Sequence, residues 1–500
     1  MLLIKRNCIF FPIIIGKEIT FVHYFEIMKR VIFYFLFIIV SYQGTVSAQK
    51  VWTLDECITY ALNNNIQIKQ QQLSTVLSKL QYHQSIAALF PSVNGSASLV
   101  YNNGQTVDMY TNQFASKTVQ SDNFYLSANV TLFNGLQLLN GLKQKQIEFL
   151  ASKYDLDKIK NDISLTIATA YLQVLYNIEL LEIAKNQLEI THQQVARTQK
   201  LFDAKTIAKG NLLTIQAQEA SDELQKVNAQ NQLDMAYLTL AQLLDLQNTT
   251  GFDIVKPVLI LPDASSLMQQ VDEIYAKALG IQPEIKSAEL KVQSAKKGLA
   301  ISRGMFSPSI TLNRSYGSGY SGASQTLQGY SVSGQQVIGF TASGENVYSP
   351  TFDYNYTKTK FWDQLDKNQN KSIGLYLNVP IFNKWQTHTM IGTSKVQLNS
   401  AQLTLQNTQN LLFKTIQQAY ADAKAALNRY NAGTKSVDAL TEAFGYTEQK
   451  FNVGMLNSID YNDAKNNLVK AQSELLQAKY EYVFRIKVLD FYQGKPLKLN

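Results

Sequence analysis

The sequence of 500 residues contains few of the residues that interrupt or cross-link a chain: 9 prolines, 24 glycines and 2 cysteines. Collagen-like and low-complexity architectures need far more glycine and proline. Cys8 lies in a segment that we expect to be removed, so Cys57 remains a free thiol and no disulfide framework is available. With 45% hydrophobic and 17% charged residues, the chain is too apolar for intrinsic disorder. The composition predicts a folded chain with long uninterrupted elements.

A strong excess of one charge is also missing. The net charge is +8, and the basic residues are scattered along the chain instead of forming a patch. Proteins that bind nucleic acid usually concentrate basic residues on one face. We therefore expect no nucleic-acid partner.

The N-terminus resembles a secretory signal. Two basic residues precede the apolar run 31–40, and small residues of the kind that signal peptidase reads end at Ala48. The run is shorter than the roughly 20 apolar residues of a membrane-spanning helix. We expect cleavage between Ala48 and Gln49, and we interpret residues 1–27 as an upstream extension.

The chain contains an internal repeat with two constant offsets. Leu54 and Val271 begin a series of matches 217 residues apart, and a later series that ends at Phe202 and Phe451 is 249 residues apart. The second copy therefore has 32 extra residues, which must fall between positions 308 and 379. Polar residues and glycine dominate there, so we expect a long polar loop.

Each copy is predicted to contain a helix, two strands, a very long helix, a short break and a further helix. No proline occurs between Ser92 and Lys256 or between Ile381 and Lys495. Apolar residues recur at helical spacing from Gly135 to Phe202, and the matching span is 384–451. At 1.5 Å per residue each span is about 100 Å long. Helices of this length bury their apolar stripes by coiled-coil-like packing.

Strict alternation of apolar and polar residues predicts strands at about 122–134 and 372–383, and a weaker alternation predicts strands at about 92–104 and 309–320. Nine or ten alternating residues suit a tilted strand that crosses a bilayer, with lipid on one side and water on the other. A half-buried strand of a soluble sheet is the alternative. Arg314 would face lipid unless it lies near the headgroups. The residues expected to face lipid are Leu126, Val130, Leu375, Leu377 and Val379.

Four strands cannot close a barrel, and an open edge in hydrocarbon would leave backbone groups without hydrogen-bond partners. Closure needs at least eight strands, hence two or more subunits, and 12 strands from three subunits would enclose a lumen wide enough for solutes. The long helices follow the strand ends at Asn134 and Asn383, so they would extend the barrel as a tube.

The ordered set of motifs resembles the TolC family of outer-membrane efflux proteins. It comprises Leu-Phe-Asn-Gly at 132–135, Pro-Ile-Phe-Asn at 380–383 and Lys-Phe-Asn-Val-Gly-Met at 450–455. The ending 489–497 is similar to that of family members from Bacteroidetes-type bacteria, and the resemblance covers residues 52–497.

The resemblance implies a mainly helical chain with membrane strands, assembled as a homotrimer with a 12-stranded outer-membrane β-barrel and a 12-helix periplasmic α-barrel. The implied function is an outer-membrane channel of a tripartite efflux or type I secretion system. Its partners would be a periplasmic adaptor, an inner-membrane transporter of the resistance-nodulation-division or ABC class, and outer-membrane lipid. The alternative is a secreted coiled-coil scaffold of the periplasm. The expected organisation is a signal segment at 1–48, a first repeat at 49–246, an equatorial linker at 247–270, a second repeat at 271–492 and a tail at 493–500.

Two aspartates are candidates for a gate. Asp460 and Asp463 are three residues apart after a break in the helical pattern, so they share one face of a helix start. By position they match the paired aspartates that ring the periplasmic entrance in the family and bind cations. The alternative is an exposed helix N-terminus, where acidic residues favour the helix dipole.

The two breaks are candidate docking tips, because the family uses such tips to bind the adaptor. The first break is Ala204-Lys205-Thr206-Ile207, and the second is Val453-Gly454-Met455-Leu456. Gly454 also suits the positive φ that ends a helix. Lys205 stands where a glycine would be expected.

Signals for catalysis are weak, and we expect no enzyme activity, no cofactor and no metal site. The glycines at 317, 319 and 322 match a dinucleotide motif formally, but no helix is predicted after them. His83, His192 and His388 are isolated from one another and from acidic clusters.

Overall fold

The computed structural model describes residues 51–115, 118–246, 251–257, 261, 267 and 269–497. The expected signal segment and its cleavage position, and parts of the linker 247–270, lie outside the described residues. Contacts within the chain separate a small unit, residues 1–51 and 251–253, from a large unit that holds the rest. The two-residue strands β1 (Val51–Trp52) and β6 (Asp253–Ile254) each have one residue in either unit.

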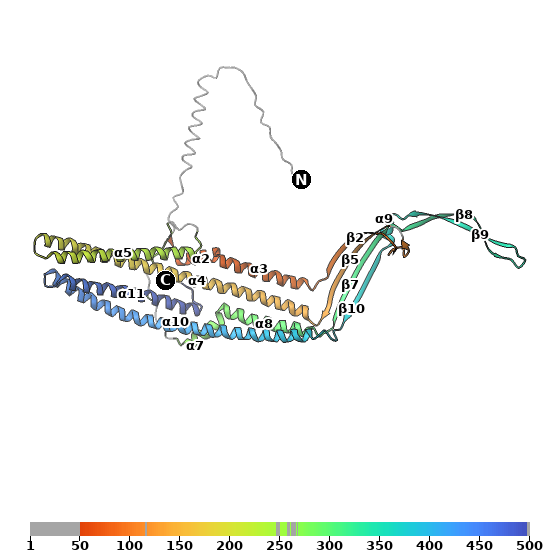
Figure 1. Ribbon diagram of the computed structural model, residues 1–500. Helices are drawn as coiled ribbons and strands as arrows, with labels where there is room; N and C mark the ends of the chain where they lie inside the picture. The colour runs from red at the N-terminus through yellow and green to blue at the C-terminus, as the bar shows by residue number, and fades with distance from the viewer. Residues whose placement is uncertain are drawn as a thin grey trace, which may run out of the picture. The chain divides into compact units, whose positions relative to one another are not determined.

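The duplication expected from the sequence is confirmed by the helices (Figure 1), because each helix of the first repeat has a partner of equal length in the second. The 11-residue pair is α2 (Leu54–Asn64) and α7 (Val271–Ile281), and the 22-residue pair is α3 (Ile66–Ala87) and α8 (Pro283–Gly304). The 67-residue pair is α4 (Gln137–Asp203) and α10 (Gln386–Asn452), and the 35-residue pair is α5 (Lys209–Leu243) and α11 (Ser458–Tyr492).

Each long helix begins at a sharp turn, which follows β5 directly in the first repeat and lies several residues beyond the last sheet strand in the second. Leu136 and Trp385 precede the helices with φ of 61° and 65°. The Asn134 side-chain oxygen accepts a hydrogen bond from the N–H of Leu138, and Asn383 accepts one from Thr387, both at 3.4 Å. Asn134, at the end of β5, and Asn383, beyond the last sheet strand of the second repeat, therefore each supply an acceptor for an N–H group that a helix start leaves unpaired.

Four antiparallel strands form the main sheet in the order β10-β7-β5-β2. Their bounds are β2 (Ser92–Asn102), β5 (Val119–Asn134), β7 (Ser309–Ser321) and β10 (Asn370–Asn378). The four strands lie in the sheet in the same order as along the chain, so the two repeats join where β5 pairs with β7. The outer edges of β2 and β10 have no partner strand among the described residues.

The register of this sheet gathers apolar side chains on one face. Leu375 lies opposite Leu312, which lies opposite Val130, and Leu126 lies opposite Tyr316. Directly opposed residues point to the same side of a sheet. The other face carries Asn129, Ser127, Asn313, Ser315 and Ser372. Arg314 lies on the apolar face, between Ile373 and Ala128.

Two details of the strands differ from expectation. A bulge between Thr131 and Phe133 places Phe133, in place of Leu132, opposite Ile310, so the alternation changes phase there. Strand β10 ends at Asn378, and Val379 lies beyond it. Pro380 lacks an N–H group and restricts the residue before it, which ends the pairing earlier than the alternation suggests.

The inserted segment in the second repeat is not an irregular loop. It forms the long hairpin β8 (Gln325–Phe340) and β9 (Asn346–Lys358), followed by the short helix α9 (Phe361–Lys367). In the first repeat the described residues of the corresponding connection form the two-residue strands β3 (Thr106–Val107) and β4 (Phe114–Ala115). In β9, aromatic residues alternate with polar ones from Phe352 to Thr357, as in a strand with two different faces, and β9 pairs with β8.

Small residues let the helices of the second repeat approach closely at the middle of the helical part. The core there combines Ile274, Ile285 and Ile416 with a stripe of alanines on α10, Ala419, Ala423 and Ala426. Two equivalent tyrosines fasten the linker to the long helices α4 and α10. The hydroxyl of Tyr171 donates to the carbonyl of Val255 at 2.7 Å, and that of Tyr420 donates to the carbonyl of Leu267 at 2.9 Å.

Candidate functional site

The two helical hairpin tips are built by the same hydrogen bonds. At the first tip, Thr206 N–H donates to the carbonyl of Leu201 at 3.0 Å, and at the second Met455 N–H donates to that of Lys450 at 2.9 Å. Each turn needs a residue in the left-handed region, with φ of 59° at Lys205 and 78° at Gly454. Lysine therefore occupies the glycine position without changing the turn.

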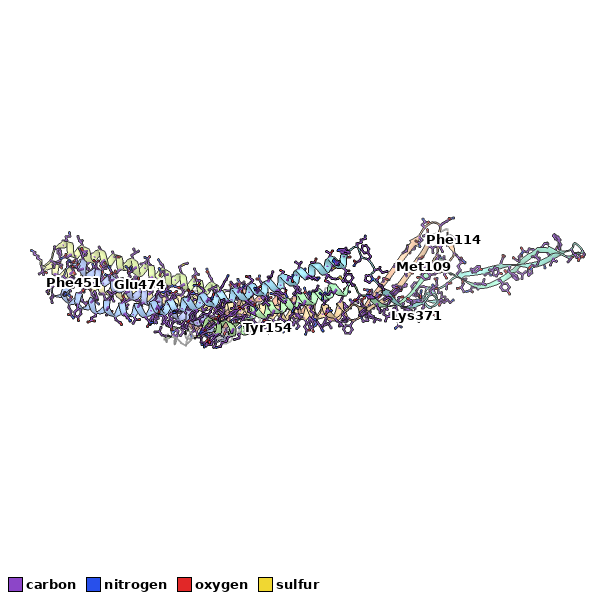
Figure 2. The ribbon with its side chains drawn as sticks, turned by 90° about the horizontal axis from the view of Figure 1, so that it is seen from below. Met109, Phe114, Tyr154, Lys371, Phe451 and Glu474 are labelled. Atoms are coloured by element: carbon purple, nitrogen blue, oxygen red, sulfur yellow. The ribbon has the colours of Figure 1, made fainter. Side chains whose placement is uncertain are left out.

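The tips expose most of the residues expected to dock a partner. Ala204, Lys205, Thr206, Val453, Gly454 and Met455 are exposed, whereas Ile207 and Leu456 are half-buried. Val453 and Met455 have 72% and 77% of their surface exposed. Figure 2 labels Phe451, which lies beside this second tip, at the end of the helices away from the strands. The second tip is thus an exposed apolar surface, and the first is more polar.

Aromatic packing and one arginine support the second tip. Tyr461 stacks on Phe451 with ring centroids 4.5 Å apart and also contacts Phe444. Burial, with the charge of Glu448, raises the pKa of Tyr461 to about 12. Arg197 of α4 donates hydrogen bonds to the side-chain oxygen of Asn452 and, at 2.9 Å, to its backbone carbonyl. The two hairpins are therefore joined near their tips.

The structure places both gate candidates on the exposed side of the first turns of α11. Asn457 caps this helix, because its side-chain oxygen accepts a hydrogen bond from the N–H of Asp460 at 2.9 Å. Asp460 and Asp463 are both exposed and lie one turn apart. Two carboxylates at one helix start can concentrate cations, and each further copy of the chain would add two more.

A buried ion pair lies about one turn beyond the gate candidates and is absent from the predictions made from sequence. Lys465 of α11 lies 3.6 Å from a carboxylate oxygen of Asp222 on α5, with 3% and 1% of the two side chains exposed. The ammonium also donates to the hydroxyl of Thr191 at 2.5 Å and to the carbonyl of Gln187 at 3.2 Å, both on α4. Burial lowers the pKa of Lys465, and the charge of Asp222 opposes that shift.

The signal for this pair was present in the sequence. Lys465 interrupts a stripe of buried residues at helical spacing that includes Tyr461 and Leu468. A lysine in such a stripe needs a counter-charge. Nothing local identifies Asp222 as that partner, because it lies 243 positions earlier in the sequence.

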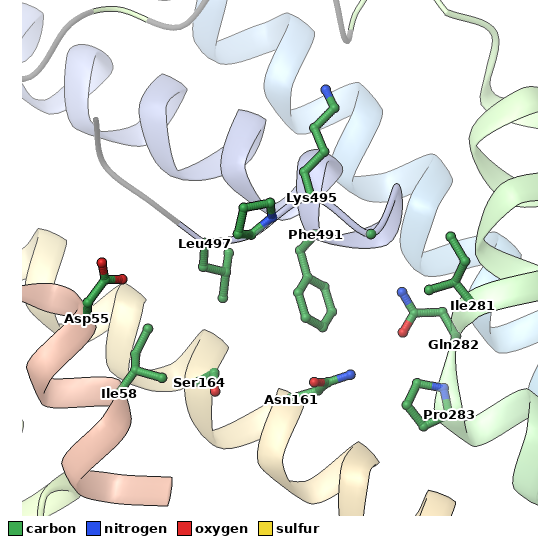
Figure 3. A pocket seen from close by; sticks show the side chains of 12 residues that line it. Asp55, Ile58, Asn161, Ser164, Ile281, Gln282, Pro283, Phe491, Lys495 and Leu497 are labelled. Atoms are coloured by element: carbon green, nitrogen blue, oxygen red, sulfur yellow. The ribbon is translucent and has the colours of Figure 1, made fainter.

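A pocket of about 370 Å³ lies where the two repeats meet the C-terminal segment (Figure 3). Asp55 and Ile58 of α2 and Ser164 of α4 line one side, and Pro283 and Phe491 line the other. Glu284, next to Pro283, has a pKa raised by burial. Burial, followed by the charges of Glu284 and Asp162, raises the pKa of Tyr492 to about 12. Neither Glu284 nor Tyr492 lines the pocket, and the residues that do line it form no set of convergent ligands.

Within the described part of the chain, no cluster of three or more histidine, cysteine or acidic residues could hold a metal ion. None of the described helices is both long and apolar enough to span a membrane.

The comparisons with known proteins agree with this geometry. A model of the outer membrane efflux protein family matches residues 57–245 and 274–490. Outer membrane protein TolC of Escherichia coli is 22% identical over 389 residues, which cover 72% of this chain and 71% of that protein. Outer membrane efflux protein BepC of Brucella suis is 22% identical over 438 residues, which cover 86% and 83% of the two chains.

The fold is shared with solved structures. That of CusC, a protein that forms a transmembrane channel, superposes with a TM-score of 0.72 over 89% of this chain and 92% of that one, at 16% identity. The family model describes outer membrane efflux proteins, TolC and BepC are outer membrane proteins, and CusC forms a transmembrane channel. They favour the export channel over the periplasmic scaffold. The family match covers both repeats and most of the chain, and this protein therefore belongs to the outer membrane efflux protein family.

Proposed function

We propose that three copies of this chain form one continuous exit channel, with a 12-stranded barrel in the outer membrane and a helical tube in the periplasm. The observation that carries this proposal is the four-stranded sheet, which has one apolar face, one polar face and two edges without partners. Pairing the edge of β10 with β2 of the next copy keeps the strands antiparallel. Three copies then close the sheet, with the apolar face toward lipid.

The lipid-facing surface would include Leu126, Val130, Leu375 and Leu377, which share the apolar face. Val379, just past β10, would lie at the periplasmic boundary. The helices begin at the strand ends, so they continue the wall of the barrel. Substrates would be delivered by an inner-membrane transporter through a periplasmic adaptor, in an efflux or a type I secretion system.

The adaptor would dock at the hairpin tips. The turns at Lys205 and Gly454 have the same backbone geometry, so two equivalent tips per chain give six per trimer. Exposed Val453 and Met455 supply apolar contact at the second tip, and Lys205 supplies a charge at the first. One adaptor hairpin could therefore meet two tips of similar shape and different chemistry.

Asp460 and Asp463 would line the periplasmic entrance as a ring of six carboxylates. Such a ring attracts cations and impedes anions, as charged rings do in pores. We expect purified protein in planar bilayers to give discrete conductance steps that divalent cations block from the periplasmic side.

Replacing both aspartates by alanine should raise the divalent concentration needed for half block by at least tenfold. Asp438→Ala, which removes an exposed aspartate of α10, is the matched control and should leave the block unchanged. Absence of conductance steps would refute the channel, and unchanged block in the double variant would refute only the gate.

A further inference from the structure

The hairpin β8–β9 has one aromatic face and one polar face. In its register Leu327 lies opposite Tyr356, Tyr330 opposite Tyr354, and Val332 opposite Phe352. The intervening residues of β9 include Thr351, Asp353, Asn355 and Thr357. We call the first surface the aromatic face; it comprises Leu327, Tyr330, Val332, Val337, Tyr348, Phe352, Tyr354 and Tyr356.

The rings of the aromatic face contact one another but remain open to solvent in the single chain. Tyr330 and Phe352 form an edge-to-face pair at 5.1 Å, and Tyr330 and Tyr354 lie 6.3 Å apart. Tyr330 and Tyr354 still have 64% and 53% of their surface exposed. A hairpin of two strands is marginally stable in water, and a large exposed apolar patch marks an interaction surface.

The few charges of the hairpin favour a second copy of the hairpin over a bilayer surface as the partner of the aromatic face. Residues 325–358 contain three charged side chains, Glu345, Asp353 and Lys358. Elements that lie on a bilayer surface carry several lysines or arginines that meet anionic headgroups. One lysine against two acidic residues does not provide that attraction. A second copy of the hairpin, which is almost neutral, would meet little repulsion.

The proposed trimer would bring copies of the hairpin within reach of one another. β8 follows β7, and the β7 strands of adjacent subunits would be four strands apart, or about 19 Å at 4.8 Å per strand. With 16 residues, β8 spans about 50 Å at roughly 3.3 Å per residue, which is more than enough to reach a neighbour.

We propose that the three β8–β9 hairpins pack against one another through their aromatic faces and form a shared extension at the outer end of the channel. This inference rests on the proposed trimer. It assigns the hairpin that distinguishes the second repeat from the first to contact between subunits. The polar faces would then remain in water.

The test is cross-linking between subunits from neighbouring positions on opposite faces. Tyr354→Cys is placed on the aromatic face and Asn355→Cys on the polar face, each in the full chain. Cys57 is buried and can stay. A bis-maleimide with an arm of about 10 Å should give covalent dimers, the largest product that one reactive cysteine per chain allows, at least fivefold more efficiently with Tyr354→Cys than with Asn355→Cys, both on intact cells and on purified protein.

Native mass measured on the same samples separates the two proposals. If particles with the mass of three chains give no more cross-linked product at Tyr354→Cys than at Asn355→Cys, the hairpin contact is refuted while the trimer stands. Labelling of Tyr354→Cys that appears only after lipid is removed would identify the bilayer as occupant and also refute it. Particles with the mass of one chain would refute both proposals.

Discussion

Lys465 shows how a single charged residue can be buried in a helical bundle. Its ammonium group donates hydrogen bonds to Thr191 and Gln187, and the Asp222 carboxylate, 3.6 Å away, supplies the counter-charge. These three residues come from two helices of the first repeat, while Lys465 belongs to the second. The cost of removing the charges from water is therefore offset only when α4, α5 and α11 lie together.

Removing one partner of this pair should destabilise the protein strongly. Lys465→Met leaves the Asp222 carboxylate buried without a counter-charge, which we expect to lower the free energy of unfolding by about 3–5 kcal/mol. Adding Asp222→Leu to this variant should recover most of the loss, because no charge then remains buried. Denaturant unfolding of the solubilised protein measures both changes.

The control for this cycle is Lys470→Met, which replaces an exposed lysine of the same helix. It should change stability by less than about 0.5 kcal/mol. Equal loss in the single and double variants would show that the ion pair contributes only packing.

At the scale of elements, the register of the sheet shows which residues of different strands share a face, whereas the alternation within one strand does not. Leu375 and Tyr376 are neighbours in β10, both exposed in the single chain, but Leu375 shares its face with Leu312 and Val130 while Tyr376 lies opposite Thr311. Exposure alone does not distinguish lipid from lumen. The cross-strand neighbours of each residue reveal which face is apolar.

Lysine substitutions at these two positions should therefore differ. Leu375→Lys would place a charge against hydrocarbon at a cost of about 2–4 kcal/mol near the midplane, whereas Tyr376→Lys would place it in the watery lumen. We expect a much lower yield of folded, heat-modifiable protein in outer membranes for Leu375→Lys. Equal yields for the two variants would contradict the assignment of the faces.

At the scale of the whole molecule, the free edges of β2 and β10 determine the assembly. Open edges within hydrocarbon leave N–H and C=O groups unpaired, at several kcal/mol for each group. Closure by further copies satisfies these groups, and the polar face then surrounds a common lumen. The same closure would place the gate aspartates and the hairpin tips of all copies around one axis.

The native mass of the detergent-solubilised protein tests this assembly. We expect three times the mass of the mature chain, because three four-stranded sheets give the 12 strands proposed for the barrel. Native mass spectrometry in mild detergent would measure it. A stable folded monomer would contradict the assembly, since its sheet would then keep two open edges.

The sequence by itself determined the features that repeat locally. The two series of matches, each with a constant offset, predicted two matched sets of helices. The 67-residue helices appear where helical periodicity continues without proline. Alternation located the four strands, and the break at Gly454 located a tip. These features depend on residues within a few turns or along one strand, so a local pattern is enough to show them.

Only the tertiary structure decided the features that depend on distant partners. The bulge beside Phe133 exists because Phe133 pairs with Ile310 on another strand. The burial of Lys465 depends on the counter-charge of Asp222. The insertion has alternating rings in β9, but its polar composition conceals a hairpin whose two faces become distinct only when β8 pairs with it. A cross-strand or interhelical contact joins residues far apart in the chain. Its interaction energy depends on both residues, so the local sequence around either one does not reveal it.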